Sequence, residues 1–392
     1  MSGTSQVDRT GVLLPEPDVD AVASSTQLIG RIVERIEQRN GVLRFDEYMQ
    51  MALYEPGLGY YSSAVEIGAA GDFVTAPQIS PLFGDCIAHQ IRSVVEQGCV
   101  PQILEFGAGN GHLCMQIMQA MPELERYLIL DLSAGLRQRQ QAYLKAHLDA
   151  EQYQKIMWLE RLPTGFSGVV LANEVLDAMP VRLVEKQAPW CEFGVGFDGR
   201  GFEWQRISVD ATLQAALVQL ESKVGEFALG YRSEVNLNFG PWMQALAEAC
   251  DQVIMLIIDY GFEQTDYYHP QRNQGTLICH YRHRVHQDPL IFPGLQDITA
   301  FVDFDAAADA GEAAGFTVSG LITQTEFLLA NGLLEVAEQR SKAADTVMQF
   351  NLSQQIKTLT LPQEMGEKFK VLALQKALAL DLPAMPRGGV YG

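Results

Sequence analysis

The sequence predicts a doubly wound α/β fold with a mostly parallel sheet, on the basis of three observations. Short apolar strands alternate with helices from Gln102 onward, which implies parallel strands joined by right-handed crossovers. The segment Val253–Ile258 carries no charge, as expected of a strand that is buried on both faces. A glycine-rich loop joins the first strand of this series to the next helix, where such sheets bind their ligands.

The chain divides into a tail, a helical extension and a sheet domain that an insertion interrupts. Residues 1–24 are rich in Ser, Thr, Asp and Pro and show no periodicity, which is typical of a flexible tail. After residue 180 the pattern becomes antiparallel, with a turn at 197–201. We predict a flexible tail at 1–24, a helical N-terminal extension at 25–100, the first part of the sheet domain at 101–180, an inserted antiparallel and helical region at 181–250, and the second part of the sheet domain with C-terminal helices at 251–392.

Hydrophobic spacing gives the elements in order. Leu28, Ile32 and Ile36 recur at helical spacing and predict a helix over 25–39. Pro81 suits the first turn of a helix that runs to 97. Apolar runs bounded by turn residues predict strands at 102–106, 126–132, 155–159, 168–172, 253–259, 316–322 and 369–374, and antiparallel strands within 181–207. Further helices are predicted at 45–53, after the glycine loop to 121, after the second strand to 147, at 211–222, 241–250 and 303–314, and twice more before the last strand.

Composition argues against several classes of function. The chain has 28 Lys and Arg against 48 Asp and Glu, a net charge of −20, and so acidic a surface repels nucleic-acid phosphates and anionic membranes. The longest run of large aliphatic residues has six members, whereas a membrane-spanning helix needs about 20. Residues 1–25 have no apolar core, and the six cysteines form no CxxC motif. These features predict a reducing, cytoplasmic location.

The glycine loop runs from Glu105 to His112 with the spacing G-x-G-x-G. Glycines let the backbone approach a ligand closely. A dinucleotide fingerprint needs a glycine where His112 stands, and a phosphate-binding P-loop needs a Gly-Lys-Ser/Thr that is absent from the sequence here. Glu105 would repel a pyrophosphate but suits a sulfonium and its amino group. A plain glycine-rich turn between strand and helix is the alternative.

Asp131 ends the second strand, 20 residues after Gly111. A carboxylate at this position can accept hydrogen bonds from both hydroxyls of a ribose. Together with Glu105 and the glycine loop, it resembles the class I S-adenosylmethionine-dependent methyltransferases, whose fold is Rossmann-like. S-adenosyl-L-methionine is therefore the cofactor that we expect.

A second polar motif, Asn173–Pro180, follows the fourth strand. If a helical turn begins there, Glu174 and Asp177 face the same way. Two carboxylates in one pocket can bind a guanidinium and hold its nitrogen in line with a sulfonium methyl group. The alternative is a helix cap, with Asn173 as the N-cap and the acidic residues in the first turn. No aromatic residue follows that could stack a nucleic-acid base.

Other carboxylates admit structural explanations. Asp259 ends the fifth strand and can either point into the same crevice or cap the following turn. Asp297 and Thr299 precede an apparent helix, so capping can explain them.

The most basic stretch of the chain is Cys279–His286. Its basic residues alternate and would share one face of a strand, which would contact an acidic partner or cover the active site. The alternatives are a strand face that is exposed to solvent and internal salt bridges to the many acidic residues. A metal site is not expected, because the pattern is that of a strand rather than a helix. The residues concerned are His280, Arg282, Arg284 and His286.

Eight segments, in this order, resemble the MidA-like family of methyltransferases, which has mitochondrial and bacterial members. The resemblance covers about residues 25–375 and implies a class I methyltransferase sheet with a helical N-terminal extension and an inserted α+β substrate-side region. The segments are Gly59–Ser62, Gly71–Pro77, Leu104–Gly111, Asn173–Val181, Ile258–Gly261, Gly275–Leu277, His286–Phe304 and Gln324–Leu328.

The resemblance also implies an activity, the methylation of an arginine nitrogen in a partner protein. A respiratory-complex subunit is the partner that the mitochondrial members suggest. Apolar helices such as 328–336 either pack internally or form the interface of a homodimer. No nucleic acid, no membrane insertion and no metal are expected. The alternatives are a methyltransferase for a small-molecule acceptor and an assembly chaperone that retains a vestigial cofactor site.

The predicted site follows from these motifs. Thr75, within Gly71–Pro77, would contact the carboxylate of the cofactor, although a tight turn explains it as well. The predicted catalytic residues are Glu174 and Asp177, and the predicted cofactor-binding residues are Thr75, Glu105, Gly107, Ala108, Gly109, Gly111, Asp131, Leu132 and Asn173.

Overall fold

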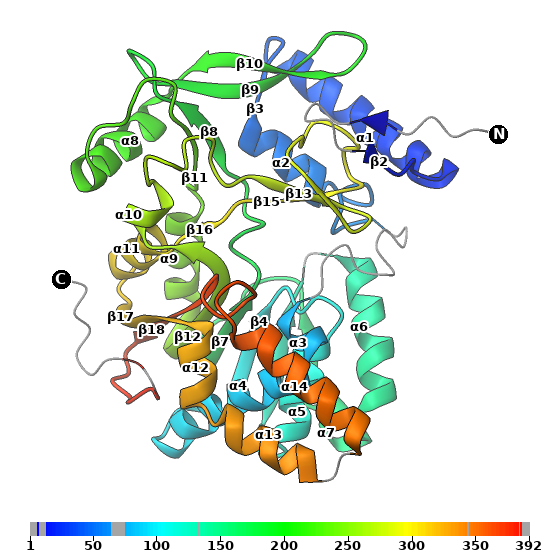
Figure 1. Ribbon diagram of the computed structural model, residues 1–392, viewed down its shortest axis with the longest axis vertical. Helices are drawn as coiled ribbons and strands as arrows, with labels where there is room; N and C mark the ends of the chain where they lie inside the picture. The colour runs from blue at the N-terminus through cyan, green and yellow to red at the C-terminus, as the bar shows by residue number, and fades with distance from the viewer. Residues whose placement is uncertain are drawn as a thin grey trace. The chain divides into compact units, whose positions relative to one another are not determined.

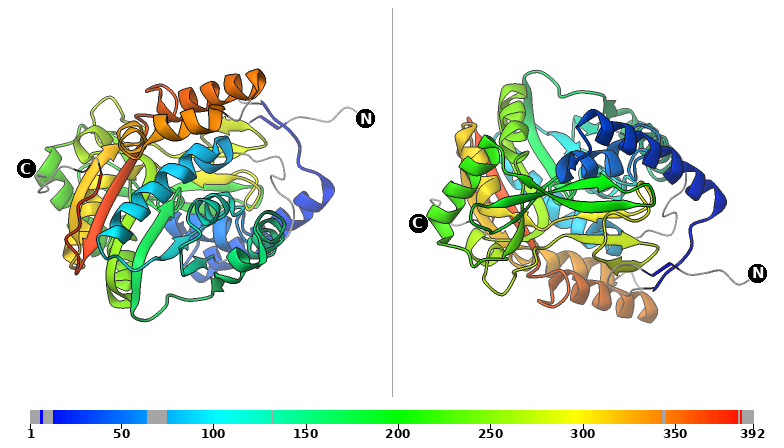
Figure 2. Two further views of the ribbon diagram at one scale, coloured as in Figure 1. Left: turned by 90° about the horizontal axis from the view of Figure 1, so that it is seen from below. Right: turned by 90° about the horizontal axis from the view of Figure 1, so that it is seen from above.

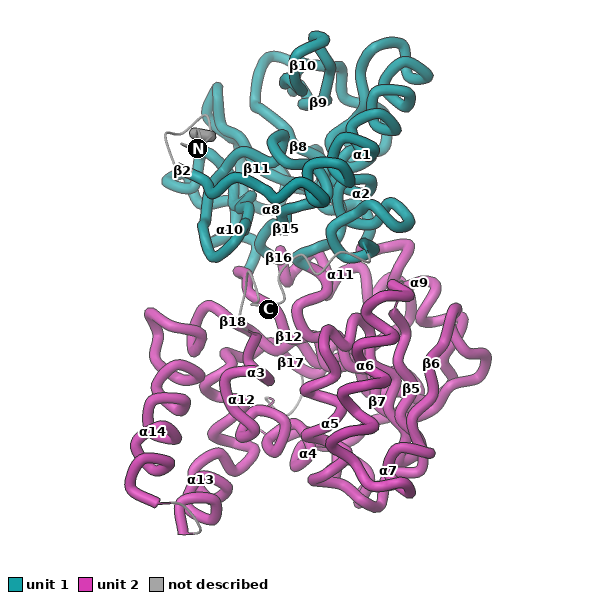
Figure 3. The backbone as a smooth tube through the Cα atoms, turned by 90° about the vertical axis from the view of Figure 1, so that its right-hand side faces the viewer, with its two compact units in different colours: residues 1–73, 177–238, 263–301 teal, residues 74–176, 239–262, 302–392 magenta. Residues whose placement is uncertain are grey.

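The computed structural model describes residues 6–7, 13–63, 75–131, 133–342, 345–383 and 385. The chain forms two units, each assembled from three separate stretches (Figure 3). Unit 1 comprises residues 1–73, 177–238 and 263–301, and unit 2 comprises residues 74–176, 239–262 and 302–392. The glycine loop and the strands around it belong to unit 2.

An eight-stranded sheet forms the centre of unit 2 (Figure 1). Seven strands follow the order β17-β18-β12-β7-β4-β5-β6, and β16 pairs with β12. β18 runs antiparallel to both of its neighbours, whereas the other pairs are parallel. The strands are β4 (Gln102–Phe106), β5 (Arg126–Leu130), β6 (Ile156–Leu159), β7 (Phe166–Asn173), β12 (Cys250–Phe262), β16 (Val302–Asp303), β17 (Thr317–Thr323) and β18 (Phe369–Lys376).

The helices of unit 2 pack in two groups, as a doubly wound sheet requires. α9 packs with α11, whereas α13 packs against α4 and α14 against α3. Figure 2 shows the C-terminal helices in orange beside α4 in cyan. The helices are α3 (Ala76–Ile79), α4 (Pro81–Glu96), α5 (His112–Ala120), α6 (Ala134–His147), α7 (Ala150–Gln154), α9 (Phe239–Ala249), α11 (Phe304–Ala313), α12 (Gln324–Ala330), α13 (Leu333–Lys342) and α14 (Thr346–Thr360).

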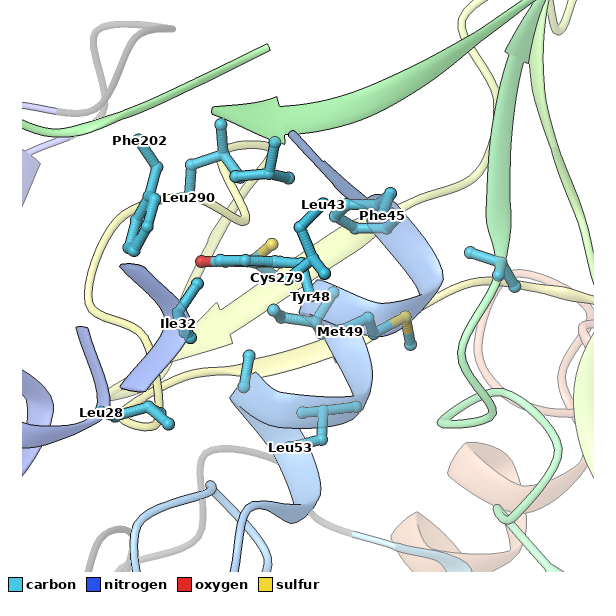
Figure 4. Packing of buried hydrophobic residues seen from close by; sticks show 14 of the residues in the cluster. Leu28, Ile32, Leu43, Phe45, Tyr48, Met49, Leu53, Phe202, Cys279 and Leu290 are labelled. Carbon is cyan, nitrogen blue, oxygen red and sulfur yellow. The ribbon is translucent and has the colours of Figure 1, made fainter. Parts of the chain in front are cut away.

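Unit 1 contains a five-stranded sheet, in the order β10-β9-β8-β11 with β3 paired to β9, and a three-stranded sheet, β14-β13-β15. Leu28 and Ile32 from α1 and Tyr48 and Leu53 from α2 are fully buried in its core (Figure 4). Each such aliphatic side chain contributes about 1.5–3 kcal/mol on burial. The elements are β1 (Gln6–Val7), β2 (Leu13–Leu14), α1 (Val19–Gln38), β3 (Leu43–Arg44), α2 (Phe45–Tyr54), β8 (Arg182–Glu185), β9 (Cys191–Phe197), β10 (Phe202–Ser208), α8 (Ala211–Val224), β11 (Arg232–Val235), α10 (Gln264–Tyr267), β13 (Ile278–Tyr281), β14 (Arg284–His286) and β15 (Asp297–Thr299).

Most predicted elements are confirmed to within a few residues. α2 begins at Phe45, α4 begins at Pro81 and β4 spans 102–106, all as predicted. Three helices rather than two precede the last strand. α1 begins at Val19, inside the stretch predicted to be a tail, because Asp18 caps it by accepting the Ala21 N–H at 2.9 Å. Among the described helices, none is long and apolar enough to cross a membrane.

The single strand predicted over 279–286 is wrong. Arg282 and His283 have φ angles of 46° and 60° and form a tight turn between β13 and β14. Arg282 pairs with Asp18 at 3.0 Å, and His280 and His286 are buried, so the basic residues do not share one exposed face. Within the described residues, no three His, Cys, Asp or Glu side chains are grouped to hold a metal ion.

Candidate active site

The glycine loop turns sharply between β4 and α5. All three glycines have positive φ, 59° at Gly107, 53° at Gly109 and 86° at Gly111, where residues with a Cβ are strained. The Gly111 N–H donates to the Ala108 carbonyl at 2.8 Å. A Cβ on Gly109 would meet no described heavy atom within 4 Å, whereas one on Gly111 would lie 3.3 Å from Leu144. The Gly109 backbone is therefore the part of the loop that a ligand can approach closely.

One buried glutamine joins this loop to Asp131. Gln140, on α6, donates from Nε2 to the Gly109 carbonyl and to Asp131 Oδ2, both at 2.9 Å, and its Oε1 accepts from Trp158 Nε1. Asp131 Oδ1 accepts the Ser133 N–H at 2.9 Å. Burial raises the pKa of Asp131, and these two donors partly offset that effect. Because a carboxylate has about four acceptor positions, Asp131 can still accept two hydroxyls.

Glu105 is buried in β4, only 2% exposed. Its Oε2 accepts the Tyr127 hydroxyl at 2.9 Å. Burial is the main reason that the pKa of Glu105 is raised to about 8. The hydrogen bond from Tyr127 lowers this pKa, and the charge of Asp131 raises it. The carboxyl is therefore mostly protonated at pH 7. Glu105 is thus a weaker source of negative charge at the crevice than the sequence predicts, because burial favours its protonated form.

The chain bends after β7, at Glu174. Glu174 has a φ of 54°, which costs about 1–3 kcal/mol for a residue with a Cβ. Asp259, fully buried, accepts the next two backbone N–H groups on Oδ2 at 3.2 and 2.9 Å. Asp259 therefore caps this bend after β7, and not the turn that follows its own strand, which was the cap predicted from the sequence. Residues 174–177 form no helix, so the shared helical face and the Asn173 N-cap predicted from the sequence are both wrong.

The two predicted catalytic carboxylates belong to different units. Glu174 is in unit 2, and Asp177 begins the second stretch of unit 1, where its carbonyl accepts the Ala300 N–H at 3.0 Å. Asn173 Nδ2 donates to Glu174 Oε1 at 3.1 Å. Asn173 Oδ1 is buried and has no hydrogen-bond partner among the residues that the structure describes. This acceptor at the end of β7 is therefore a candidate contact for a ligand.

Two further predicted cofactor contacts lie at the margins of the described chain. Thr75 directly precedes α3, and its N–H donates to Gln78 Oε1 at 3.0 Å. Leu132 and Gly71–Val74 lie outside the described residues.

Comparison with known proteins identifies the class to which this loop belongs. A family model described as "Putative S-adenosyl-L-methionine-dependent methyltransferase" matches residues 85–322, more than half of the chain. The chain belongs to this family. It is a MidA-like methyltransferase, and the resemblance stated from its motifs is confirmed.

Curated relatives and a solved structure agree with this assignment. The mitochondrial protein arginine methyltransferases NDUFAF7 of Danio rerio and Mus musculus are 28% and 29% identical to this chain. Their matches cover 85% and 89% of this chain and 83% and 84% of the relatives. A crystal structure from Burkholderia thailandensis with bound S-adenosyl-homocysteine is 38% identical, with a TM-score of 0.88 over 96% of this chain and 98% of that one. The fold is thus a class I methyltransferase fold, and the cofactor of this methyltransferase is S-adenosyl-L-methionine.

The residues at the loop fit this cofactor. The Gly109 backbone leaves room that a Cβ would fill. Asp131 retains acceptor positions for the two ribose hydroxyls. Beside it, Gln140 fixes the carboxylate and the loop in one geometry.

The contacts of Gln140 and Asp259 could not be predicted from the sequence. Gln140 is one of several glutamines on an otherwise polar helix, and only its burial distinguishes it. Asp259 does not end its strand as predicted, because β12 continues to Phe262, and the partners of its carboxylate lie 83 and 84 residues away in the sequence. Local patterns in a single sequence carry no signal for such contacts.

Proposed function

We propose that this methyltransferase methylates an arginine nitrogen of a partner protein. The observation that carries the proposal is the strained bend at Glu174, which places a carboxylate directly after β7 at a φ of 54°. Non-glycine residues keep such angles when surrounding contacts enforce them, and they are concentrated at active sites. The names of the curated relatives, which are protein arginine methyltransferases, point to the same acceptor.

The chemistry requires a nitrogen to be oriented and a proton to be accepted. Bound S-adenosyl-L-methionine supplies the methyl group on a sulfonium. Glu174 would accept hydrogen bonds from the guanidinium and take up the proton that leaves the nitrogen as the new N–C bond forms. Asp177 follows three residues later, so the chain limits the separation of the two Cα atoms to about 11 Å. A second carboxylate from Asp177 would then complete the guanidinium contacts.

The cofactor contacts belong to the same proposal. Gly107, Ala108, Gly109 and Gly111 would line the cofactor with backbone atoms, and Asp131 would bind the ribose. Three further contacts are proposed with the cofactor: Thr75 with its carboxylate, Leu132 with its adenosyl part, and Asn173 through its buried Oδ1.

The test uses methyl-labelled S-adenosyl-L-methionine, the full-length protein and a heat-treated cell extract as acceptor. Acid hydrolysis of the labelled protein should yield methylarginine. Glu174→Gln should lower the labelling rate about 100-fold or more, whereas Glu248→Gln, an exposed carboxylate on α9, should leave it unchanged. Label on lysine, on carboxylates or only on small molecules would reject the arginine proposal. Unaltered labelling by Glu174→Gln would reject the role of that residue.

Partners and location are also proposals. A respiratory-complex subunit as acceptor rests on the family alone. A homodimer has support from exposed apolar side chains on α14, where Val347 and Phe350 are 69% and 62% exposed, and size-exclusion chromatography tests it. The curated relatives are named mitochondrial, so they give no support to the cytoplasmic location predicted from the sequence.

Binding of the cationic cofactor should release about one proton at pH 7 if Glu105 contacts it. The cation favours the ionised carboxyl and lowers its pKa from about 8, so affinity should rise with pH up to that value. Without cofactor, the folded carboxyl keeps a proton that the unfolded chain loses near 4.5. The stability of unit 2 should therefore fall as the pH rises from 4.5 to 8.

Calorimetric titration in buffers of different ionisation enthalpy measures this proton release. Glu105→Gln should abolish it and flatten the pH dependence of affinity. Equal proton release by the wild type and Glu105→Gln would show that another group titrates.

A further inference from the structure

Three tyrosines of unit 1 contact one another where α2 ends. The rings of Tyr54 and Tyr61 are stacked with centroids 5.5 Å apart, and the rings of Tyr60 and Tyr61 meet edge to face with centroids 5.1 Å apart. All three side chains are only partly buried, so each keeps some accessible surface. We call these three residues the tyrosine cluster. Two of them, Tyr60 and Tyr61, belong to the family segment Gly59–Ser62, to which the sequence alone assigns no role.

Two carboxylates lie beside the tyrosine cluster. Tyr61 donates its hydroxyl to Asp297 Oδ1 at 2.8 Å. Tyr54 donates its hydroxyl to the carbonyl of Ala178 at 3.0 Å, and Asp177 is the residue directly before Ala178 in the chain. Burial raises the pKa of the Tyr61 phenol, and the charges of Asp297 and Asp177 raise it further, so both carboxylates are within electrostatic reach of this ring.

Strand β15, which carries Asp297, also carries a buried hydroxyl with no hydrogen-bond partner among the described residues. Asp297 and Thr299 are two residues apart in β15 and therefore lie on one face, opposite the core residue Ile298. They do not cap a helix, as the sequence suggested. Thr299 is 2% exposed, and its Oγ1 has no hydrogen-bond partner among the described residues. Leaving a buried hydroxyl without a hydrogen bond is unfavourable, and a donor on a ligand would remove that cost.

We propose that the tyrosine cluster, together with Asp177, Asp297 and Thr299, binds the guanidinium of the acceptor arginine. This inference rests on the proposed function and names the residues that select its acceptor. A guanidinium is flat, weakly hydrated and carries five N–H donors. Accessible aromatic surface attracts such a cation, and the two carboxylates and the Thr299 hydroxyl accept its hydrogen bonds. A lysine ammonium offers only three donors and no flat face, so arginine is preferred.

The experiment measures binding of N-acetyl-L-arginine methylamide to the full-length protein by ligand-observed NMR. The citrulline analogue, which has the same shape without the charge, is the matched probe. Wild type should bind the arginine probe and discriminate against citrulline about tenfold or more. Asp297→Asn and Tyr61→Leu should each weaken arginine binding about tenfold, whereas Tyr61→Phe, which keeps the ring, should lose less.

Asp20→Asn is the charge-matched control, because Asp20 is an exposed carboxylate in the first turn of α1 in the same unit. It should bind both probes like the wild type. Affinity for S-adenosyl-L-methionine should be unchanged in every variant, since none of the substituted residues is among the proposed cofactor contacts. Near-ultraviolet circular dichroism reports whether each variant is folded. If Tyr61→Leu is unstable, Asp297→Asn still tests the proposal, because that substitution keeps the size of the side chain.

Two results would overturn this inference: equal binding of arginine and citrulline probes by the wild type, or wild-type binding by both Asp297→Asn and Tyr61→Leu. The labelling experiment separates this failure from that of the proposed function. Label on arginine with unaffected variants would reject only the tyrosine cluster. Probe binding that depends on Asp297 and Tyr61, without label on arginine, would support the cluster and reject the reaction.

Discussion

Gly109→Val is expected to reduce the affinity for S-adenosyl-L-methionine about 100-fold or more, equal to about 2.7 kcal/mol. In the folded protein a Cβ at this position meets no described atom within 4 Å, so the branched side chain enters the space that the cofactor needs. Methyl transfer should be lost in parallel. Calorimetric titration with the cofactor measures the effect, and circular dichroism reports whether the fold is retained.

A matched control separates steric exclusion from backbone strain. Gly199, in the hairpin between β9 and β10, also has positive φ, 88° against 53° at Gly109, and also has no neighbour within 4 Å of a built Cβ. Gly199→Val should therefore carry a comparable strain and bind the cofactor normally. Equal loss of affinity in both variants, or normal affinity in Gly109→Val, would contradict the assignment of this loop.

Glu192→Ala is expected to destabilise unit 1 by about 3–5 kcal/mol, because it leaves a buried arginine without its principal partner. Arg182 on β8 and Glu192 on β9 form two hydrogen bonds and are 3% and 0% exposed. Asp210 contacts the same guanidinium at 2.9 Å from a partly exposed position and compensates only in part. Hydrogen exchange of the β8 and β9 amides in the intact protein should accelerate about 100-fold or more.

Glu338→Ala provides the comparison at the surface. Glu338 pairs with Lys342 at 2.8 Å with both side chains 70% exposed, and such pairs contribute about 0–1 kcal/mol. Hydrogen exchange of the β8 and β9 amides should be nearly the same in Glu338→Ala as in the wild type. A Glu192→Ala protein whose β8 and β9 amides exchange like those of the wild type would show that the buried pair does not stabilise unit 1.

The central sheet could be predicted because its signals are local. An uncharged stretch such as Val253–Ile258 is buried on both faces in almost any context, and β12 lies there in the structure. The hairpin at 279–286 could not be predicted, because alternating basic residues continue across its turn. Arg282 and His283 occupy turn positions that usually require glycine or asparagine, so no turn signal was present. The division of the chain between two units depends on contacts between distant segments, which hydrophobic periodicity does not encode.

Some residues of the candidate site could likewise be placed from the sequence, and others could not. The glycine loop and Asp131 form a motif with fixed spacing, so their position directly after β4 and β5 followed from the sequence. The ionisation of Glu105 did not, because it depends on burial and on Tyr127, 22 residues away. Asp297 and Thr299 seemed to be helix caps because strand and cap residues share short polar side chains. Only the pairing of β15 with β13 gives them a common face.

The position of β18 between β12 and β17 has a consequence for biosynthesis. On the ribosome, β12 and β17 emerge well before residues 369–376, so the gap between them is filled last. Until then β12 has one edge without a hydrogen-bonded neighbouring strand, and an unpaired strand edge of this kind promotes association with other nascent chains. Completion of the methyltransferase sheet is therefore a late event in translation, and a chain arrested before β18 should depend on chaperones to stay out of aggregates.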